Sequence, residues 1–125
     1  MVADRKIILV VEDEILIRIV AMEALTAAGF HVIEAEHADI ALALLYVKAL
    51  TIHLLFTDIH MPGTMNGLEL AHHANIHWPW IGILVTSGHA KPHHSELPVG
   101  TRFLAKPYDL EHVVTHSREL CRNTD

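Results

Sequence analysis

The chain has 125 residues, of which 51% are hydrophobic and 19% charged, and its formal net charge is −6. This length suits one domain with a single core, and the composition excludes a disordered chain. The acidic balance without a basic run argues against direct nucleic-acid binding. Because no apolar stretch could span a bilayer and the first residues lack the apolar core of a signal peptide, we expect a cytoplasmic protein without membrane insertion. A lone cysteine, Cys121, excludes an internal disulfide.

Five short apolar runs, each bounded by turn residues, predict buried strands. They cover residues 7–11, 31–35, 53–57, 81–86 and 101–105. Helical segments are predicted to begin at Ile15 and after Asp109, and to cover residues 38–50 and 66–76. The fourth interval between strands contains Pro92 and Pro98, so its helix is expected to be short or irregular.

Residues at the predicted helix ends support these assignments. Gly29 follows the first helix as an expected C′ residue, with Phe30 able to pack back on the last turn. Asn66 and Glu69 have the spacing of a capping box, and Asp109 is expected to cap the last helix. Apolar residues at helical spacing in the first helix predict its buried stripe. They are Ile15, Ile19, Met22 and Leu25.

Strands and helices alternate along the whole chain. This order predicts a doubly wound parallel sheet with helices on both faces and right-handed crossovers. Neither a linker nor a low-complexity tract interrupts it, so residues 1–125 are expected to form a single domain.

Chemically active side chains follow four of the five predicted strands. Because the carboxyl ends of parallel strands open on one edge of the sheet, these groups are expected to converge there. They are Glu12 and Asp13, Asp58, Thr86 and Ser87, and Lys106. Two carboxylates ~4 Å apart repel by about 4 kcal/mol at an effective dielectric near 20. A divalent cation would relieve this repulsion, and oxygen ligands favour Mg²⁺, with Mn²⁺ as a substitute.

A carboxylate beside a cation, a lysine and a hydroxyl is suited to stabilise phosphoryl transfer. In this arrangement Asp58 would be the nucleophile that forms an aspartyl phosphate. Asp58 is therefore the central candidate site residue. It follows the central apolar run and precedes a Pro-Gly loop.

Taken together, these motifs resemble the receiver domain of two-component response regulators, of the stand-alone chemotaxis-regulator type. The resemblance covers essentially the whole chain. It rests on Glu12-Asp13, Asp58 with Met61-Pro62-Gly63 and Asn66-Gly67, Ser87-Gly88, and Phe103-Leu104-Ala105-Lys106-Pro107. The resemblance implies the flavodoxin-like fold with strand order 2-1-3-4-5.

The same resemblance implies a role for each matching residue. Asp58 would accept the phosphoryl group, Asp13 would bind Mg²⁺ directly, and Glu12 would act near the metal. The backbone carbonyl of His60 would be a further ligand, and Lys106 would pair with Asp58 or the phosphate.

The switch is also implied by the family. Ser87 would hydrogen-bond the phosphoryl group, and Phe103 would rotate between outward and inward positions. Thr86 competes with Ser87 for the hydroxyl role; we prefer Ser87 because the small Gly88 follows it. The chain departs from the family in two places: the loop between Asp58 and Gly67 carries one extra residue, and the interval from Ser87 to Lys106 is short.

Twelve histidines raise a different possibility. His73 and His77 have an i,i+4 spacing that could bind Zn²⁺, and His72-His73 and His93-His94 are adjacent pairs. No cysteine assists them, and solvent-exposed histidines are the simpler explanation. His60 and His89 each follow a site residue by two positions, so we expect them to tune dephosphorylation.

The resemblance predicts a signalling domain, not an enzyme in its own right, that assists its own phosphorylation and dephosphorylation. Its phosphoryl donor would be a sensor histidine kinase or a histidine phosphotransfer protein, and its output a contact with a target protein that the sequence does not name. The chain could instead be a phosphate sink or a phosphorelay intermediate. A Mg²⁺-dependent phosphatase of the aspartyl-phosphate type is disfavoured, because His60 stands where such enzymes usually carry a second acid.

Overall fold

The computed structural model describes residues 5–89 and 91–122. Residues 1–4, part of the N-terminal stretch in which no signal peptide is predicted, lie outside the described residues. The described strands form one parallel sheet in the order β2-β1-β3-β4-β5. They are β1 (Ile7–Val11), β2 (His31–Ala35), β3 (Leu54–Asp58), β4 (Gly82–Ser87) and β5 (Arg102–Ala105). The predicted flavodoxin-like topology is confirmed.

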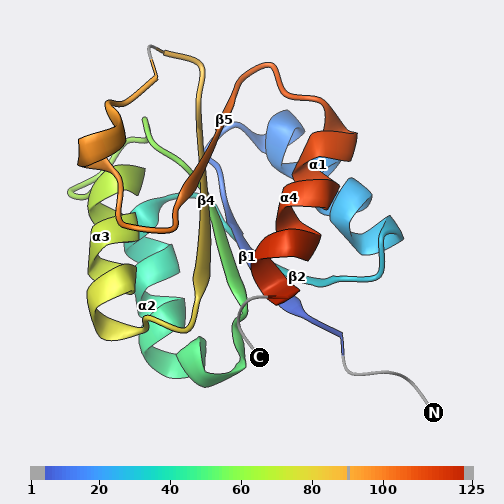
Figure 1. Ribbon diagram of the computed structural model, residues 1–125, viewed down its shortest axis with the longest axis horizontal. Helices are drawn as coiled ribbons and strands as arrows, with labels where there is room; N and C mark the ends of the chain where they lie inside the picture. Colours follow the sequence, from blue (N-terminus) through green and yellow to red (C-terminus); the bar gives the residue numbers. More distant parts are fainter. Residues whose placement is uncertain (1–4, 90, 123–125) are drawn as a thin grey trace.

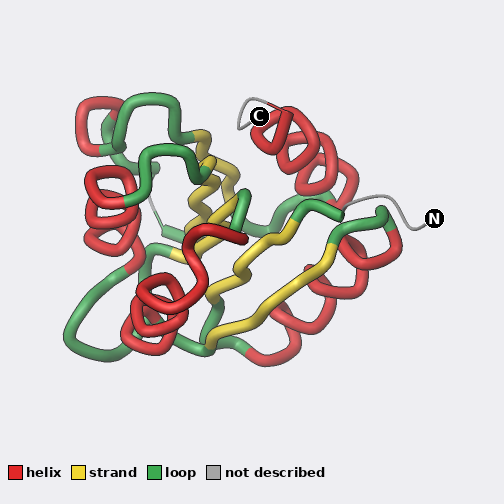
Figure 2. The backbone as a smooth tube through the Cα atoms, turned by 90° about the horizontal axis from the view of Figure 1, so that it is seen from below, coloured by secondary structure: helices red, strands yellow, loops and turns green. Residues whose placement is uncertain are grey.

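Helices cover both faces of the sheet (Figure 1). Helices α1 (Ile15–Ala27) and α4 (Leu110–Arg122) lie on one face, and α2 (Ala38–Lys48) and α3 (Gly67–His77) lie on the other. Seen along a perpendicular direction, the sheet remains sandwiched between the two helical layers (Figure 2). In the part of the chain that is described, no helix has the length and apolarity needed to cross a bilayer.

Alternation along the strands divides the core into two clusters. Leu55 and Val85 belong to the cluster beneath α2 and α3, whereas Phe56 and Leu84 belong to the cluster beneath α1 and α4. All four side chains are almost completely buried, and burying a side chain of this size contributes about 1.5–3 kcal/mol. The central strands are therefore apolar on both faces, as expected for a parallel sheet between two helical layers.

The helix ends follow the sequence signals. Gly29 adopts a positive φ of 101°, its N–H donates to the Thr26 carbonyl at 3.0 Å, and the Phe30 N–H donates to the Leu25 carbonyl at 3.1 Å. These two bonds are a Schellman motif, which requires a left-handed residue at this position. The capping box before α3 also forms, because Asn66 and Glu69 exchange side chain–backbone hydrogen bonds of 2.8 and 2.9 Å.

The segment between β4 and β5 lacks a regular helix. Its described residues contain only η2 (His94–Glu96), a three-residue 3₁₀ turn between the two prolines. The other short 3₁₀ turn, η1 (Ala49–Thr51), merely extends the end of α2. The prediction of a short or irregular fourth helix is confirmed.

The predicted buried stripe of α1 is wrong in its first half. Ile15 and Ile19 are 58% and 42% exposed, whereas Arg18 is only 8% exposed. The guanidinium of Arg18 is buried because it donates hydrogen bonds to acceptors outside its own helix, at Glu12 and Glu34. Hydrophobic periodicity cannot anticipate such acceptors, which come from other parts of the chain.

Candidate functional site

Strand alternation brings three charged side chains to the same face of the sheet. Asp58 ends β3 and continues the side of the strand that carries Phe56 beneath α1 and α4. Glu12 directly follows β1, one step beyond Val10 on that face, and Lys106 directly follows β5, one step beyond Leu104. The strand over 53–57 was predicted one residue too early, so Asp58 is held by the sheet itself.

The charges meet at the carboxyl edge of the sheet. Carboxylate oxygens of Glu12, Asp13 and Asp58 lie within 4.8 Å of one another, and among the described residues this is the one group of three such ligating side chains. The Lys106 Nζ lies 2.6 Å from Glu12 Oε1 and 3.2 Å from Asp58 Oδ2. Glu14 adds a more distant carboxylate at 3.9 Å from the same Nζ.

Burial and neighbouring charges shift the pKa values of Glu12 and Lys106. Desolvation raises the pKa of Glu12 to about 7, and Asp58 pushes it the same way, while the hydrogen bonds from Lys106 and the Glu14 N–H oppose the shift. Burial alone would lower the pKa of Lys106, but Glu12 and Asp58 outweigh burial and raise it. Lys106 is therefore a permanent cation, whereas Glu12 gains or loses its proton near neutral pH.

The residues present fit a divalent cation. Three carboxylates within 4.8 Å offer only oxygen donors, which is the ligand set of Mg²⁺ or Mn²⁺. When all three are ionised, a single lysine leaves excess negative charge in a largely buried site. Glu12, Asp13 and Asp58 are the residues that would hold such a cation.

A cavity of about 170 Å³ opens over these charges. Its lining residues are Asp13, Glu14, Asp58, His60, Gly88, His89 and Lys106. One water occupies about 30 Å³ of liquid volume, so the cavity has room for a phosphoryl group. The Asp58 carboxylate lines this cavity together with Asp13 and Glu14, and it lies beside the Lys106 ammonium.

The model of the response regulator receiver domain family matches residues 8–118. The chain belongs to this family. It is 33% identical over 119 residues to the response regulator receiver protein CpdR of Brucella abortus (strain 2308), which is 92% of this chain and 96% of that protein. Receiver domains are signalling domains of two-component systems.

Solved receiver structures resemble the whole fold. A response regulator receiver protein from Sinorhizobium medicae WSM419 superposes with a TM-score of 0.91 at 26% identity, covering 98% of both chains. The receiver domain of the hybrid histidine kinase CckA is 32% identical with a TM-score of 0.80, over 92% of this chain and 98% of that one.

The loop that follows Asp58 in this receiver domain is held from both ends. Gly67 donates its N–H to the Ile59 carbonyl at 2.8 Å, and a Cβ at Gly67 would lie 1.7 Å from the Asp58 carbonyl oxygen. Between these ends the loop contacts α2, where Thr64 Oγ1 donates to Asp39 Oδ1 at 2.7 Å.

Thr86 and Ser87 point to opposite faces of β4. Thr86 lies on the same side as Asp58, where its buried hydroxyl oxygen has no hydrogen-bond partner. Ser87 lies on the other side of the strand, the side of Val85 and of the half-buried Phe103. Its Oγ accepts a hydrogen bond from the His89 N–H at 3.0 Å. Ser87, unlike Thr86, shares a face with the predicted switch aromatic.

His60 and His89 line the cavity and contact each other. Their ring centroids are 4.2 Å apart with a 58° angle between the planes. Both residues are exposed to solvent on the outer side. They are the histidines nearest to Asp58 in the cavity wall, and the proposed ligand role of the His60 carbonyl stays a prediction.

The histidines of α3 have structural partners. His73 and His77 stack with ring centroids 4.0 Å apart, but the His73 Nε2 already hydrogen-bonds the Tyr46 hydroxyl of α2 at 2.8 Å. Burial and the neighbouring His77 lower the pKa of His73. In the described ranges, no group of three ligating side chains includes these histidines. Their contacts with Tyr46 connect α3 to α2, a structural role that the sequence did not predict.

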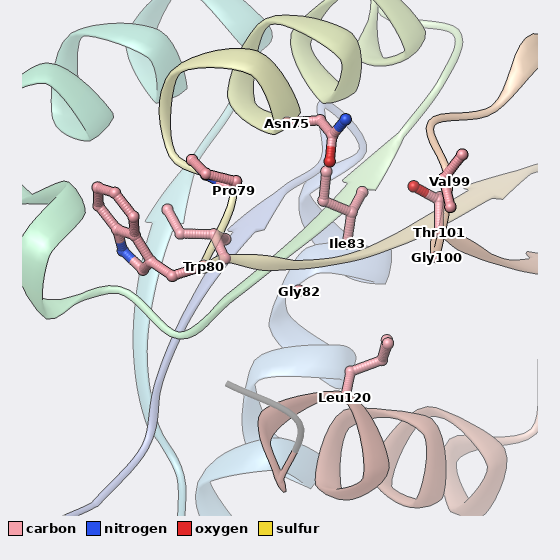
Figure 3. A pocket seen from close by; sticks show the side chains of 10 residues that line it. Asn75, Pro79, Trp80, Gly82, Ile83, Val99, Gly100, Thr101 and Leu120 are labelled. Atoms are coloured by element: carbon pink, nitrogen blue, oxygen red, sulfur yellow. The ribbon is translucent and has the colours of Figure 1, made fainter. Parts of the chain in front are cut away.

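A separate hollow of about 230 Å³ (Figure 3) shares no lining residue with the cavity over these charges. It is formed at the start of β4, where Gly82 and Ile83 lie between Asn75 of α3 and Leu120 of α4. None of its lining residues is ionisable. It therefore offers no group for phosphoryl chemistry.

Two residues that contact the site, Tyr108 and Arg18, were not predicted from the sequence. Tyr108 packs on Phe56 with ring centroids 5.8 Å apart, and burial raises the pKa of its hydroxyl to about 12. Arg18 reaches the backbone of Glu12 from within α1. Neither role follows from strand alternation, because both depend on contacts that only the folded chain creates.

Proposed function

We propose that this receiver domain accepts a phosphoryl group on Asp58 from a histidine kinase or histidine phosphotransfer protein. The observation that carries the proposal is the position of the Asp58 carboxylate, 3.2 Å from the Lys106 ammonium and within 4.8 Å of two further acids. A carboxylate that lines a cavity beside a fixed ammonium is suited to nucleophilic attack on phosphorus.

The transfer itself forms one bond and breaks another. A carboxylate oxygen of Asp58 attacks the phosphorus of a phosphohistidine, the P–N bond breaks, and its electron pair returns to the imidazole nitrogen. Lys106 turns from Glu12 and Asp58 toward a phosphoryl oxygen and stabilises the charge that moves onto it. Asp13 and Glu12 would hold Mg²⁺, and the bound cation would neutralise phosphoryl charge.

Phosphorylation would change the protein through Ser87. The added group offers new acceptors near the β4 end, and the Ser87 hydroxyl is displaced toward them from its contact with the His89 N–H. Phe103, whose ring lies 6.0 Å from the Lys91 Nζ, then occupies the vacated space. The result is a population shift between two arrangements of the face around β4 and β5, which alters contacts with a target protein.

The donor would approach over α1. Beside Lys106 lies a mainly apolar groove of about 630 Å³ lined by Leu16, Val20 and Tyr108 among others. Leu16 is 74% exposed, so α1 presents apolar surface next to the phosphoacceptor. An apolar face in this position suits a protein donor.

The direct test is incubation with acetyl phosphate and Mg²⁺, followed by intact mass measurement. We expect one phosphoryl adduct on the wild-type chain and none on Asp58→Asn at any time. Asp13→Asn, which keeps the nucleophile and weakens the cation site, should form the same adduct more slowly. An adduct of unchanged yield on Asp58→Asn would refute the proposal.

His60 and His89 are proposed to slow hydrolysis of the phosphorylated site by limiting water access through the mouth of the cavity. Replacing either with alanine should shorten the half-life of the phosphoryl group, and the double replacement should shorten it further. His93→Ala, on the exposed β4–β5 segment, is the matched control. Equal half-lives in the wild type, both single variants and the double variant would rule out the shielding role.

A further inference from the structure

Arg18 is a buried cation that the proposed transfer does not use. Its side chain is 10% exposed and belongs to α1, one turn after the acidic residues that follow β1. The guanidinium Nη1 donates to the Glu12 backbone carbonyl at 2.7 Å, and Nε donates to Glu34 Oε1 at 2.9 Å. Glu34 lies on β2, the strand that offers nothing else to the site.

The Glu12 carbonyl belongs to the peptide group that joins Glu12 to Asp13. A hydrogen bond to this oxygen fixes the orientation of that peptide plane, and thereby the directions in which both acidic side chains leave the backbone. The same residue is held from its other side, because the Glu12 N–H donates to the Ala35 carbonyl at 3.1 Å. Arg18 and the end of β2 thus clamp the turn that carries two of the three acids.

We propose that Arg18, oriented by Glu34, is a positioning residue for divalent-cation binding by Glu12 and Asp13. The inference rests on the proposed function, since it concerns the same cation site. A charge-assisted hydrogen bond from a planar guanidinium is strong and directional. Partners of this kind, one step removed from a metal, orient its ligands and change its affinity.

Whether Mg²⁺ affinity rises or falls when Arg18 is replaced distinguishes a positioning role from a purely electrostatic one. Arg18 is positively charged and repels a bound cation, so a purely electrostatic role predicts tighter Mg²⁺ binding when the charge is removed. A role in stability alone predicts unchanged affinity in the folded protein. Positioning predicts weaker binding, because the Glu12–Asp13 peptide loses its donor.

The experiment is a Mg²⁺ titration of the full chain, followed by the amide NMR shifts of residues around Asp13 and Asp58. Arg18→Met, which has similar bulk and no charge, should raise the Kd for Mg²⁺ roughly tenfold, at the low end of such effects. Arg102→Met is the matched control. It removes another arginine that forms an ion pair, with Glu119, at the opposite end of β5, and it should leave the Kd unchanged.

Two further variants keep the test decisive if Arg18→Met does not fold. Arg18→Lys keeps the charge but lacks the planar guanidinium that bonds both acceptors. Its Kd for Mg²⁺ should therefore be raised nearly as much as that of Arg18→Met. Glu34→Gln should weaken binding more than Glu36→Gln, which removes the same charge from a residue without a hydrogen bond to Arg18. Wild-type affinity in Arg18→Lys would show that the planar guanidinium and its pair of hydrogen bonds are not needed, and would overturn the inference.

Failure of the inference is distinguishable from failure of the proposed function. If the wild-type chain neither binds Mg²⁺ nor becomes phosphorylated, the proposed function is wrong and the inference with it. If the wild type does both, and Arg18→Met binds Mg²⁺ equally or more tightly, only the positioning role of Arg18 is wrong.

Discussion

Thr86 has a buried hydroxyl, and its effect on the free energy of unfolding can be measured. The residue is 2% exposed and its oxygen has no hydrogen-bond partner, although burying an unsatisfied polar group costs about 1–3 kcal/mol. Valine has nearly the same shape without the hydroxyl. We expect Thr86→Val to raise the free energy of unfolding by about 1 kcal/mol in urea titrations. A loss of stability would mean that the hydroxyl has a partner in solution.

Glu12 makes stability and cation binding depend on pH. Its pKa is about 7 in the folded protein against 4.5 as the ordinary value, so the folded chain binds the extra proton between these limits. Stability contributed by this group therefore falls as pH rises from about 4.5 to about 7, and is constant above that window.

The free energy of unfolding, measured in EDTA at pH 5 and pH 8, tests this direction of the pH dependence. The wild type should lose more stability than Glu12→Gln between the two values, because the glutamine cannot release a proton. Mg²⁺ affinity should move in the opposite direction and increase from pH 6 to pH 8, since the cation competes with the proton. Parallel pH profiles for the two proteins would contradict the raised pKa.

The turn into α3 has no space for a side chain. A Cβ at Gly67 would lie 1.7 Å from the Asp58 carbonyl oxygen and 2.9 Å from the Ile59 Cα. Gly67→Ala must shift the backbone that carries Asp58, and we expect it to cost about 3 kcal/mol or more and to slow phosphorylation. Gly100→Ala, where nothing lies within 4 Å but φ is +85°, should cost only about 1–2 kcal/mol. Equal costs in denaturant titrations would contradict the close approach.

Helix α1 carries an exposed apolar surface beside the site. Leu16→Glu should slow phosphoryl transfer from a protein donor, because the charge must be desolvated in the contact, while labelling by acetyl phosphate stays unchanged. Leu50→Glu, on a residue that is 90% exposed after α2, is the control and should affect neither reaction. Comparing the phosphorylation rates with the protein donor and with acetyl phosphate therefore distinguishes an effect on donor binding from an effect on phosphoryl transfer itself.

Local signals in the sequence were sufficient for the helix ends. Gly29 has no Cβ to resist a positive φ, and Asn66 with Glu69 satisfies backbone donors within four residues, so each motif is visible in a short window. The buried face of α1 was not predictable in the same way. Arg18 is buried because of acceptors at Glu12 and Glu34, whose positions depend on the pairing of β1 with β2.

Across the whole molecule, the parallel sheet was predictable from the alternation of strands and helices, and the convergence of acids from the parallel sheet, whereas the observed strand order 2-1-3-4-5 was implied by the family resemblance. Asp58 and Lys106 are 48 residues apart in sequence yet 3.2 Å apart in space, because parallel strands end on one edge. The irregular segment after β4 was predictable from its prolines. The path of the lengthened loop was not, since it depends on a hydrogen bond between Asp39 and Thr64, 25 residues apart.

The central claim is that acids from separate strand ends recruit a cation that enables phosphorylation of Asp58. The most direct measurement is the rate of phosphoryl adduct formation from acetyl phosphate as Mg²⁺ is varied, with the modified residue located by peptide mass spectrometry. We expect a rate that saturates with Mg²⁺, falls to background in EDTA, and places the adduct on Asp58 alone. An equal rate in EDTA, or an adduct on any other residue, would contradict the account.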